Sequence, residues 1–110
     1  MIARTWRGST RAEDAEPYLE YLEHSGLAAF RATPGNRGAL VFRRVAEGRA
    51  EFFLVSLWES LEAVCRFAGE DEGRAVFYPE DDRYLVGRDL HVDHFELVYA
   101  AGNLAELGGA

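Results

Sequence analysis

Four stretches of the chain are rich in apolar residues, and each of them predicts a β-strand. In the first stretch, apolar and polar residues alternate with a period of two, which places successive side chains on opposite faces of a strand. Glu47-Gly48 lies between the second and third stretches and is typical of a hairpin turn. The predicted strands, in chain order, are Ile2–Arg7, Ala39–Val45, Phe52–Trp58 and His91–Tyr99.

Two other stretches carry apolar residues at the spacing of an amphipathic helix. The first follows Thr10-Arg11-Ala12-Glu13, which has the pattern of a capping box. Regular helix is expected from about Asp14 to a stop at Gly26. The second is expected to be capped by Ser60 and to end at Gly69. Its predicted buried stripe consists of Leu61, Val64, Cys65 and Ala68.

The order strand, helix, strand, strand, helix, strand predicts an α+β fold of the ferredoxin-like βαββαβ type. A four-stranded antiparallel sheet then carries both helices on one face, and the first and last strands are neighbours. Both faces of the third strand are apolar, but the helices cover only one. A second copy of the chain would cover the other, so we predict a homodimer. The two apolar sets are Phe53, Val55 and Leu57, and Phe52, Leu54 and Trp58.

Composition limits the kinds of partner. The 110 residues fit one domain over residues 1–100, followed by a loose tail over residues 101–110. With 19 acidic and 12 basic residues, the net charge is −7, which disfavours nucleic acid and anionic membranes as partners. Cys65 is the single cysteine, so neither an intrachain disulfide nor a zinc cluster is expected. The N-terminus lacks the apolar run of a signal peptide, and we expect a cytoplasmic protein.

Several segments resemble a known family. They are the opening strand Ile2–Gly8, the turn Thr33–Gly38 that leads into the hairpin, Leu57-Trp58-Glu59-Ser60 before a helix, and Phe77–Leu85. With these segments the chain resembles the antibiotic biosynthesis monooxygenase group of dimeric α+β barrel proteins over nearly its whole length. The last segment is similar to one found in small bacterial proteins of unknown role. The resemblance implies the ferredoxin-like fold and a homodimer forming an α+β barrel.

The activity implied by the resemblance is less definite, because the group includes cofactor-free quinone oxygenases, haem-degrading oxygenases and isomerases. The haem-degrading branch has an asparagine in the first strand, a tryptophan in the second helix and a histidine soon after it. Here the first strand has no asparagine, and Phe67 and Phe77 stand at the later positions. Haem degradation is therefore not expected, and neither is a bound cofactor. Trp58 could stand for the tryptophan of the quinone oxygenases.

Arg4, His94 and Glu96 are the predicted catalytic residues. Arg4 lies on the first strand and the other two share a face of the last, so pairing of these strands would bring the three together. Arginine could hold an anionic or enolate oxygen, and histidine suits proton transfer near neutral pH. The alternative interpretation is a structural ion-pair network or a solvated row.

Trp6, Trp58 and Tyr78 are the predicted substrate-binding residues. Trp58 could form a stacking wall for a flat ligand, or it could be a core tryptophan. A metal site is not expected, since the consecutive acids Glu80–Asp82 suit the positive end of a helix better than a chelate. His91 and His94 would lie on opposite faces of a strand and so do not form a ligand pair.

Three functions agree with these features. The first is a cofactor-independent monooxygenase-like enzyme acting on a small aromatic or polyketide-like substrate. The second is a non-catalytic dimer that binds a small ligand, and the third is a structural dimer without a ligand. A ligand-sized cavity between the sheet and the helices would separate the first two from the third.

Overall fold

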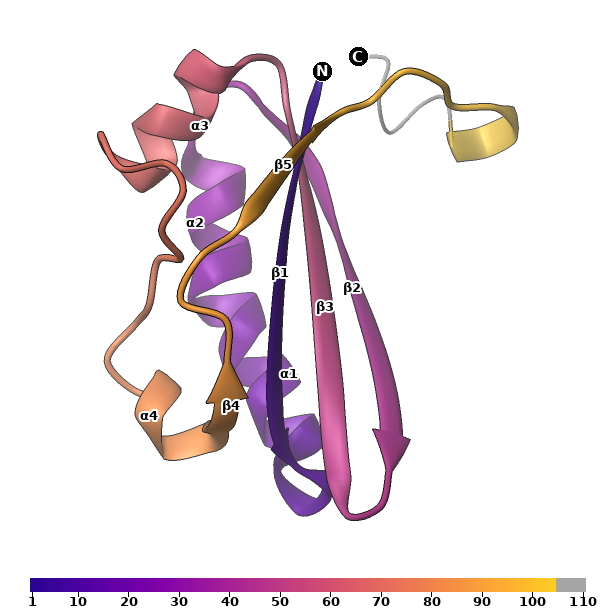
Figure 1. Ribbon diagram of the computed structural model, residues 1–110, viewed down its shortest axis with the longest axis vertical. Coiled ribbons are helices and arrows are strands. Elements are labelled where there is room, and N and C mark those ends of the chain that lie inside the picture. The colour runs from indigo at the N-terminus through magenta and orange to yellow at the C-terminus, as the bar shows by residue number, and fades with distance from the viewer. Residues whose placement is uncertain (105–110) are drawn as a thin grey trace.

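The computed structural model describes residues 1–104 and confirms the predicted α+β fold, with an antiparallel sheet and helices on one of its faces (Figure 1). The sheet has the order β2-β3-β1-β4, and β5 also pairs with β1. The strands are β1 (Ile2–Arg11), β2 (Asn36–Ala46), β3 (Arg49–Trp58), β4 (Leu85–Arg88) and β5 (Asp93–Glu96). The helices are η1 (Ala12–Asp14), α1 (Ala15–His24), α2 (Gly26–Ala32), α3 (Leu61–Ala68), α4 (Asp81–Tyr84) and η2 (Gly102–Leu104).

The end of the sheet differs from the prediction. The strand predicted over His91–Tyr99 is shorter: it is β5, which pairs with residues 2–5 of β1. A further short strand that was not predicted, β4, precedes it and pairs with residues 8–10 of β1. The connection between β4 and β5 is hydrogen-bonded to the segment after α3: Ala75 N–H donates to the Leu90 carbonyl and Val92 N–H to the Gly73 carbonyl, each at 2.9 Å. Residues 73–75 are thereby held beside the β4–β5 connection.

The first helical region also differs from the prediction. Thr10 lies within β1 and its hydroxyl donates to the Arg11 carbonyl, so the capping box does not form. Gly26 does not end the helix; it begins α2 after a break at Ser25, whose hydroxyl donates to the Tyr21 carbonyl at 2.7 Å. Gly26 is buried and lies against the ring of Tyr78, so its backbone is part of the packing rather than a free stop.

Two other local predictions are confirmed. Glu47 and Gly48 both have positive φ, 53° and 77°, as a tight hairpin turn requires. Ser60 caps α3 by accepting a hydrogen bond from Ala63 N–H at 3.1 Å. The buried stripe of α3 is partly wrong, because Leu61 is exposed and Ala63 is buried beside the turn at Gly35.

The core lies between the sheet and the helices, in two clusters of buried residues. One consists of Ala15, Tyr18, Leu22, Ala50, Phe52, Leu54 and Leu85, and the other of Phe30, Trp58, Ala63 and Val64. The opposite face of the sheet carries exposed apolar side chains, among them Phe42 and Phe95, which are 52% and 57% exposed. The prediction of two apolar sheet faces therefore agrees with the structure.

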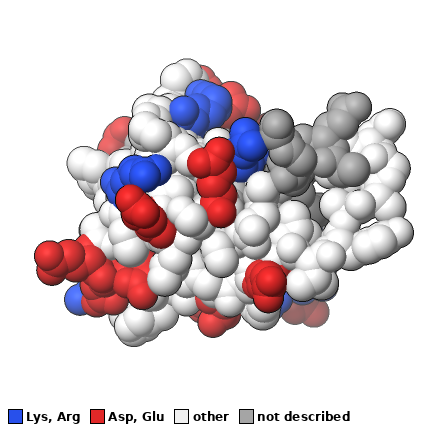
Figure 2. All heavy atoms as spheres, turned by 90° about the horizontal axis from the view of Figure 1, so that it is seen from above, with Lys and Arg blue, Asp and Glu red and all other residues white. Residues whose placement is uncertain are grey.

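Two observations concern a membrane or nucleic acid as a partner. In the part of the chain that the structure describes, no helix is both long and apolar enough to cross a bilayer. On the face seen in Figure 2, acidic and basic side chains are interspersed with uncharged ones and form no continuous basic surface. Residues 101–104 are exposed, and the remainder of the predicted tail, 105–110, lies outside the described residues.

Candidate functional site

Arg4 and His94 are brought together, as the sequence predicts. β1 and β5 pair so that Arg4 lies opposite His94 and Ile2 lies opposite Glu96. Arg4 is only 4% exposed, and its Nη1 lies 3.2 Å from His94 Nε2. Glu96 is exposed, and among residues 1–104 it forms no hydrogen bond or ion pair with either of them. The carboxylate that acts on both is instead Glu72, whose effect on each group is electrostatic.

The guanidinium of Arg4 is held by the segment after α3. It donates to the carbonyls of Glu72 and Arg74, at 2.5 and 2.9 Å, and lies over the ring of Phe67 at 5.7 Å from its centroid. Burial lowers the pKa of Arg4 to about 10, and electrostatic interactions with Cys65 and Glu72 act in the opposite direction. Arg4 therefore stays a cation at neutral pH and links the sheet to residues 72–74.

His94 is an acceptor in this arrangement. The guanidinium has only donors, so His94 Nε2 must accept from Arg4 with its lone pair, and the ring is neutral. Partial burial lowers the pKa of His94 below 6.5, the positive charge of Arg4 lowers it further, and Glu72 and Asp93 oppose the shift. Nε2 of His94 is thus already engaged by Arg4.

A small cavity of about 50 Å³ lies between the inner face of the sheet, helices α1 to α3 and residues 75–78. Most of its wall is apolar, and much of that is aromatic. Three of the predicted residues, Arg4, Trp6 and Tyr78, line it, whereas Trp58, His94 and Glu96 do not. The other lining residues are Tyr18, Leu22, Gly26, Phe30, Leu54, Ser56, Phe67, Ala75, Val76, Phe77, Asp81 and Val92.

The two tryptophans have different surroundings. Trp6 is fixed at the cavity wall, since its Nε1 donates to the Asp89 carbonyl at 2.8 Å and its ring meets Phe77 edge to face. Trp58 is fully buried, and its Nε1 donates to Ser56 Oγ at 2.8 Å. Trp58 thus occupies the core position that was the alternative interpretation of this residue.

Asp81 is a cavity residue that sequence reasoning missed. It is 4% exposed, and its Oδ2 accepts from the backbone N–H of Tyr78 at 2.6 Å. Burial raises the pKa of Asp81 above its ordinary value, although the Tyr78 hydrogen bond and Arg88 act against this. A spacing of three residues between Tyr78 and Asp81 is typical of a side chain that bonds back to the start of a turn, and this signal could have found it.

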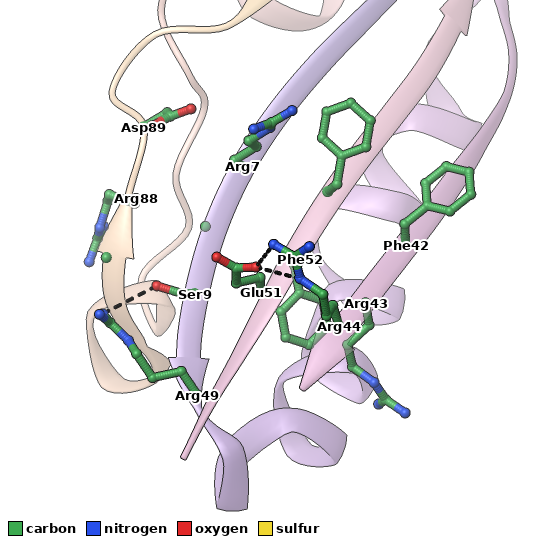
Figure 3. Close-up of a pocket in the computed structure, with 13 residues that line it drawn as sticks. Arg7, Ser9, Phe42, Arg43, Arg44, Arg49, Glu51, Phe52, Arg88 and Asp89 are labelled. Carbon is green, nitrogen blue, oxygen red and sulfur yellow. Dashed lines mark hydrogen bonds and ion pairs between the residues drawn. The ribbon is translucent and has the colours of Figure 1, made fainter. Parts of the chain in front are cut away.

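A second hollow, of about 660 Å³ and more open, lies on the outer face of the sheet (Figure 3). Phe42 and Phe53 lie in it, and the guanidinium of Arg7 is 4.9 Å from the centroid of the Phe53 ring. Arg44 pairs with Glu51 across β2 and β3. The side chain of Arg7 forms no hydrogen bond or ion pair among the described residues, so this cation lacks a counter-charge there.

The sheet and the helices on one of its faces define a ferredoxin-like α+β domain. A proposed antibiotic biosynthesis monooxygenase from Bacillus cereus has a similar structure, with a TM-score of 0.63 and 18% identity over 91% of this chain and 97% of that one. The haem degrader MhuD of Mycobacterium tuberculosis, solved with two haems in its active site, gives a TM-score of 0.58 and 24% identity over 93% and 100%. No family model matches the sequence, and neither does any curated protein.

The residues of this cavity do not fit haem. Iron in haem takes a histidine, cysteine, methionine or tyrosinate ligand, and the cavity lining has no histidine, cysteine or methionine. Its tyrosines, Tyr18 and Tyr78, have raised pKa values because of burial first and the charge of Asp81 second, so they resist ionisation. Residues 1–104 also contain no group of three or more acidic, histidine or cysteine side chains that could hold a metal ion.

Proposed function

We propose that this chain is a cofactor-independent, monooxygenase-like enzyme that binds a small aromatic or polyketide-like substrate in the inner cavity. The observation that carries the proposal is an aromatic, apolar cavity with the buried cation Arg4 on its wall. Small-molecule sites are typically apolar and contain a few convergent polar groups. The shared fold with the Bacillus cereus protein agrees with this function. The cytoplasmic location expected from the sequence stays a prediction.

The proposed chemistry takes all its electrons from the substrate. A phenol loses its hydroxyl proton, and the electron pair of the broken O–H bond spreads over the ring as a carbanion-like anion. A ring carbon then bonds to one atom of dioxygen, and the resulting hydroperoxide loses water to leave a carbonyl. One phenol and one dioxygen give one quinone and one water. The part of the protein is to position the ring and stabilise the anion.

Arg4 suits the stabilising role. A guanidinium has five N–H donors, and its contacts with Glu72, Arg74 and His94 use three, which leaves two for an anionic oxygen. A charge in a water-poor cavity interacts more strongly with a developing anion than it would in water. His94 then acts as a positioning residue, because its Nε2 fixes the orientation of the guanidinium.

The cavity is too small for a ring-sized substrate unless it widens. Typical ligand pockets have volumes of about 300–1,000 Å³, so a ring-sized substrate requires the 50 Å³ cavity to widen. Residues 75–78 form part of the wall and have no regular secondary structure, whereas most of the remaining wall comes from the sheet and helices. We propose that this segment moves outward when the substrate enters.

We also propose that the chain works as a homodimer built on the outer face of the sheet. Leu40, Phe42, Phe53 and Val55 form adjacent cross-strand pairs there, and no helix of the described chain covers them. An apolar patch of this kind on a small domain is typical of an interaction surface. The face is continuous with the hollow in Figure 3, where the unpaired Arg7 would meet an acidic group of the second copy.

Oxygen uptake with a panel of phenols and hydroquinones tests the proposed activity, with quinone formation followed by absorbance. Ala75→Phe would fill the cavity and should abolish both binding and uptake. Val86→Phe adds the same bulk at an exposed position of β4 and should leave both unchanged. Saturable binding without oxygen uptake for every compound would contradict the enzymatic function.

The second function, a dimer that binds a small ligand without turnover, is favoured by one specific observation. The guanidinium of Arg4 and the imidazole of His94 are both engaged by groups of the protein itself. A polar wall so engaged can orient a ligand without reacting with it. Binding that Ala75→Phe abolishes, together with no product after long incubation in air, would support this function.

A further inference from the structure

Among the residues that the structure describes, Asp81 is the one carboxylate that lines the inner cavity, and the function proposed above does not use it. The residue is 4% exposed and comes from the first turn of α4. Among the described residues, its side chain accepts one hydrogen bond, on Oδ2 from Tyr78 N–H at 2.6 Å, and forms no ion pair. A carboxylate has about four acceptor positions, so Oδ1 is left free to accept from another donor.

The groups around Asp81 act on its carboxylate electrostatically but do not form an ion pair with it among the described residues. Tyr18 of α1, Tyr78 of the preceding segment and Arg88 of β4 interact with Asp81 electrostatically, as does the neighbouring Asp82. Arg88 forms its ion pair with the neighbouring Asp82, at 2.6 Å, and not with Asp81. Burial outweighs the other influences and raises the pKa of Asp81, which moves this carboxylate towards the range of an effective base.

His94, the residue that the sequence favours for proton transfer, is in a poorer position. It does not line the cavity, and its Nε2 accepts from Arg4 at 3.2 Å. Using it as a base would require breaking that contact and placing a second positive charge beside the first. Asp81 needs neither change.

We propose that Asp81, rather than His94, accepts the hydroxyl hydrogen of the ligand, so that the site selects small aromatic alcohols over aromatic molecules without a hydroxyl group. The inference rests on the proposed function for its reaction step. In that step the substrate O–H bond breaks, the proton bonds to Oδ1 of Asp81, and the electron pair stays on the substrate oxygen. Arg4, also on the cavity wall, would stabilise the resulting anion. The proton on Asp81 then moves to the terminal oxygen of the peroxide anion that dioxygen forms on the ring carbon, which gives the hydroperoxide. When the C–H bond of that carbon breaks, its electron pair forms the carbonyl and the O–O bond breaks. The departing hydroxide combines with the C–H proton to form water.

Binding measurements test selection without relying on turnover. The probes are 1-naphthol, the larger 1-methoxynaphthalene and the smaller naphthalene, titrated by fluorescence. Because hydrogen bonds to charged groups are worth more than neutral ones, the protein should bind 1-naphthol at least about tenfold more tightly than either control. Asp81→Asn keeps an oxygen for Tyr78 N–H but presents an amide, and should lose this preference. Asp82→Asn, at a neighbouring exposed position, should keep it.

Circular dichroism checks that each variant is folded. If Asp81→Asn does not fold, Asp81→Ser replaces it, because a serine oxygen also accepts from the backbone N–H. An unchanged preference for 1-naphthol in a folded Asp81 variant would overturn the inference, as would the absence of any preference in the original protein.

Turnover separates this inference from the proposed function. A base must be deprotonated, so kcat/KM for oxygen uptake should rise with pH through the pKa of Asp81, and Asp81→Asn should lose that rise along with most activity. Uptake with an unchanged pH profile in Asp81→Asn would overturn the inference and leave the function standing. Loss of the 1-naphthol preference in Asp81→Asn, with no uptake by either protein, would support selection by Asp81 and refute the oxygenase function.

Discussion

Replacing Arg4 with methionine would remove the link between the sheet and the segment that follows α3. Methionine has similar length and keeps the packing of the aliphatic stem, but it has no donors. The carbonyls of Glu72 and Arg74 would lose their partners, and so would His94 Nε2. Because Arg4 is 4% exposed, water replaces these contacts only by entering the cavity.

The expected loss of stability follows from these three contacts. A hydrogen bond from a charged donor contributes about 1.5–3 kcal/mol, but the contributions of one side chain are not additive. Desolvation of the charge offsets part of the sum, because a buried cation is costly. We expect the free energy of unfolding to fall by about 2–4 kcal/mol, and Tm by on the order of 10 °C for a domain of this size.

Urea denaturation measures the global change, and amide hydrogen exchange locates it. Exchange at Ala75 and Val92 should accelerate more than at β2 and β3, because their N–H groups bond to Leu90 and Gly73 across the segment that Arg4 holds. Arg83→Met is the control, since its ion pair with Glu80 is exposed and contributes little. A change below about 0.5 kcal/mol in Arg4→Met, with unchanged exchange at both amides, would refute the structural role and leave the guanidinium free for a ligand.

Three other outcomes are expected. Light scattering should give the mass of a dimer at micromolar concentration, and Phe42→Glu on the outer face should give a monomer; equal masses would contradict the proposed interface. Because the pKa of His94 is lowered on folding, the unfolded chain binds more protons, so unfolding free energy should fall as pH drops through 6.5. His94→Gln should flatten that part of the curve, and an unchanged slope would argue against a neutral buried ring. Gly8→Ala should lower the free energy of unfolding by about 1–3 kcal/mol, measured by urea denaturation, because an added Cβ would lie 2.3 Å from the ring of Trp6. Unchanged stability would mean that the ring moves freely.

The parts of the fold that the sequence predicts correctly depend on local physical chemistry. A strand pattern needs only neighbouring residues, and the turn at Glu47-Gly48 needs only two residues that accept positive φ. The pairing of Arg4 with His94 follows from the order of the elements and the period of a strand. These features required no knowledge of the packing.

The errors occur where a distant contact decides the local structure. Gly26 has the appearance of a helix stop, but a buried position against Tyr78 makes it the start of α2. The predicted last strand is shortened to β5, with β4 as a separate strand before it, because residues 73–75 bond to the connection between them. Asp81 lies in an acidic run typical of an exposed helix start, and only tertiary packing shows that one of the three acids is buried in a cavity.

The stability of the domain and the size of its cavity depend on the same side chain. Arg4 holds residues 72–74 in place, and residues 75–78 directly after them form the wall that must move outward for a ring-sized ligand. Ligand affinity is therefore the intrinsic affinity reduced by the cost of opening this wall. Because Arg4 retains two N–H groups, an anionic ligand can recover part of that cost through the same guanidinium. A neutral molecule without an acceptor opposite Arg4 cannot, so under the proposed function the closed wall should favour ligands that present an oxygen acceptor to Arg4.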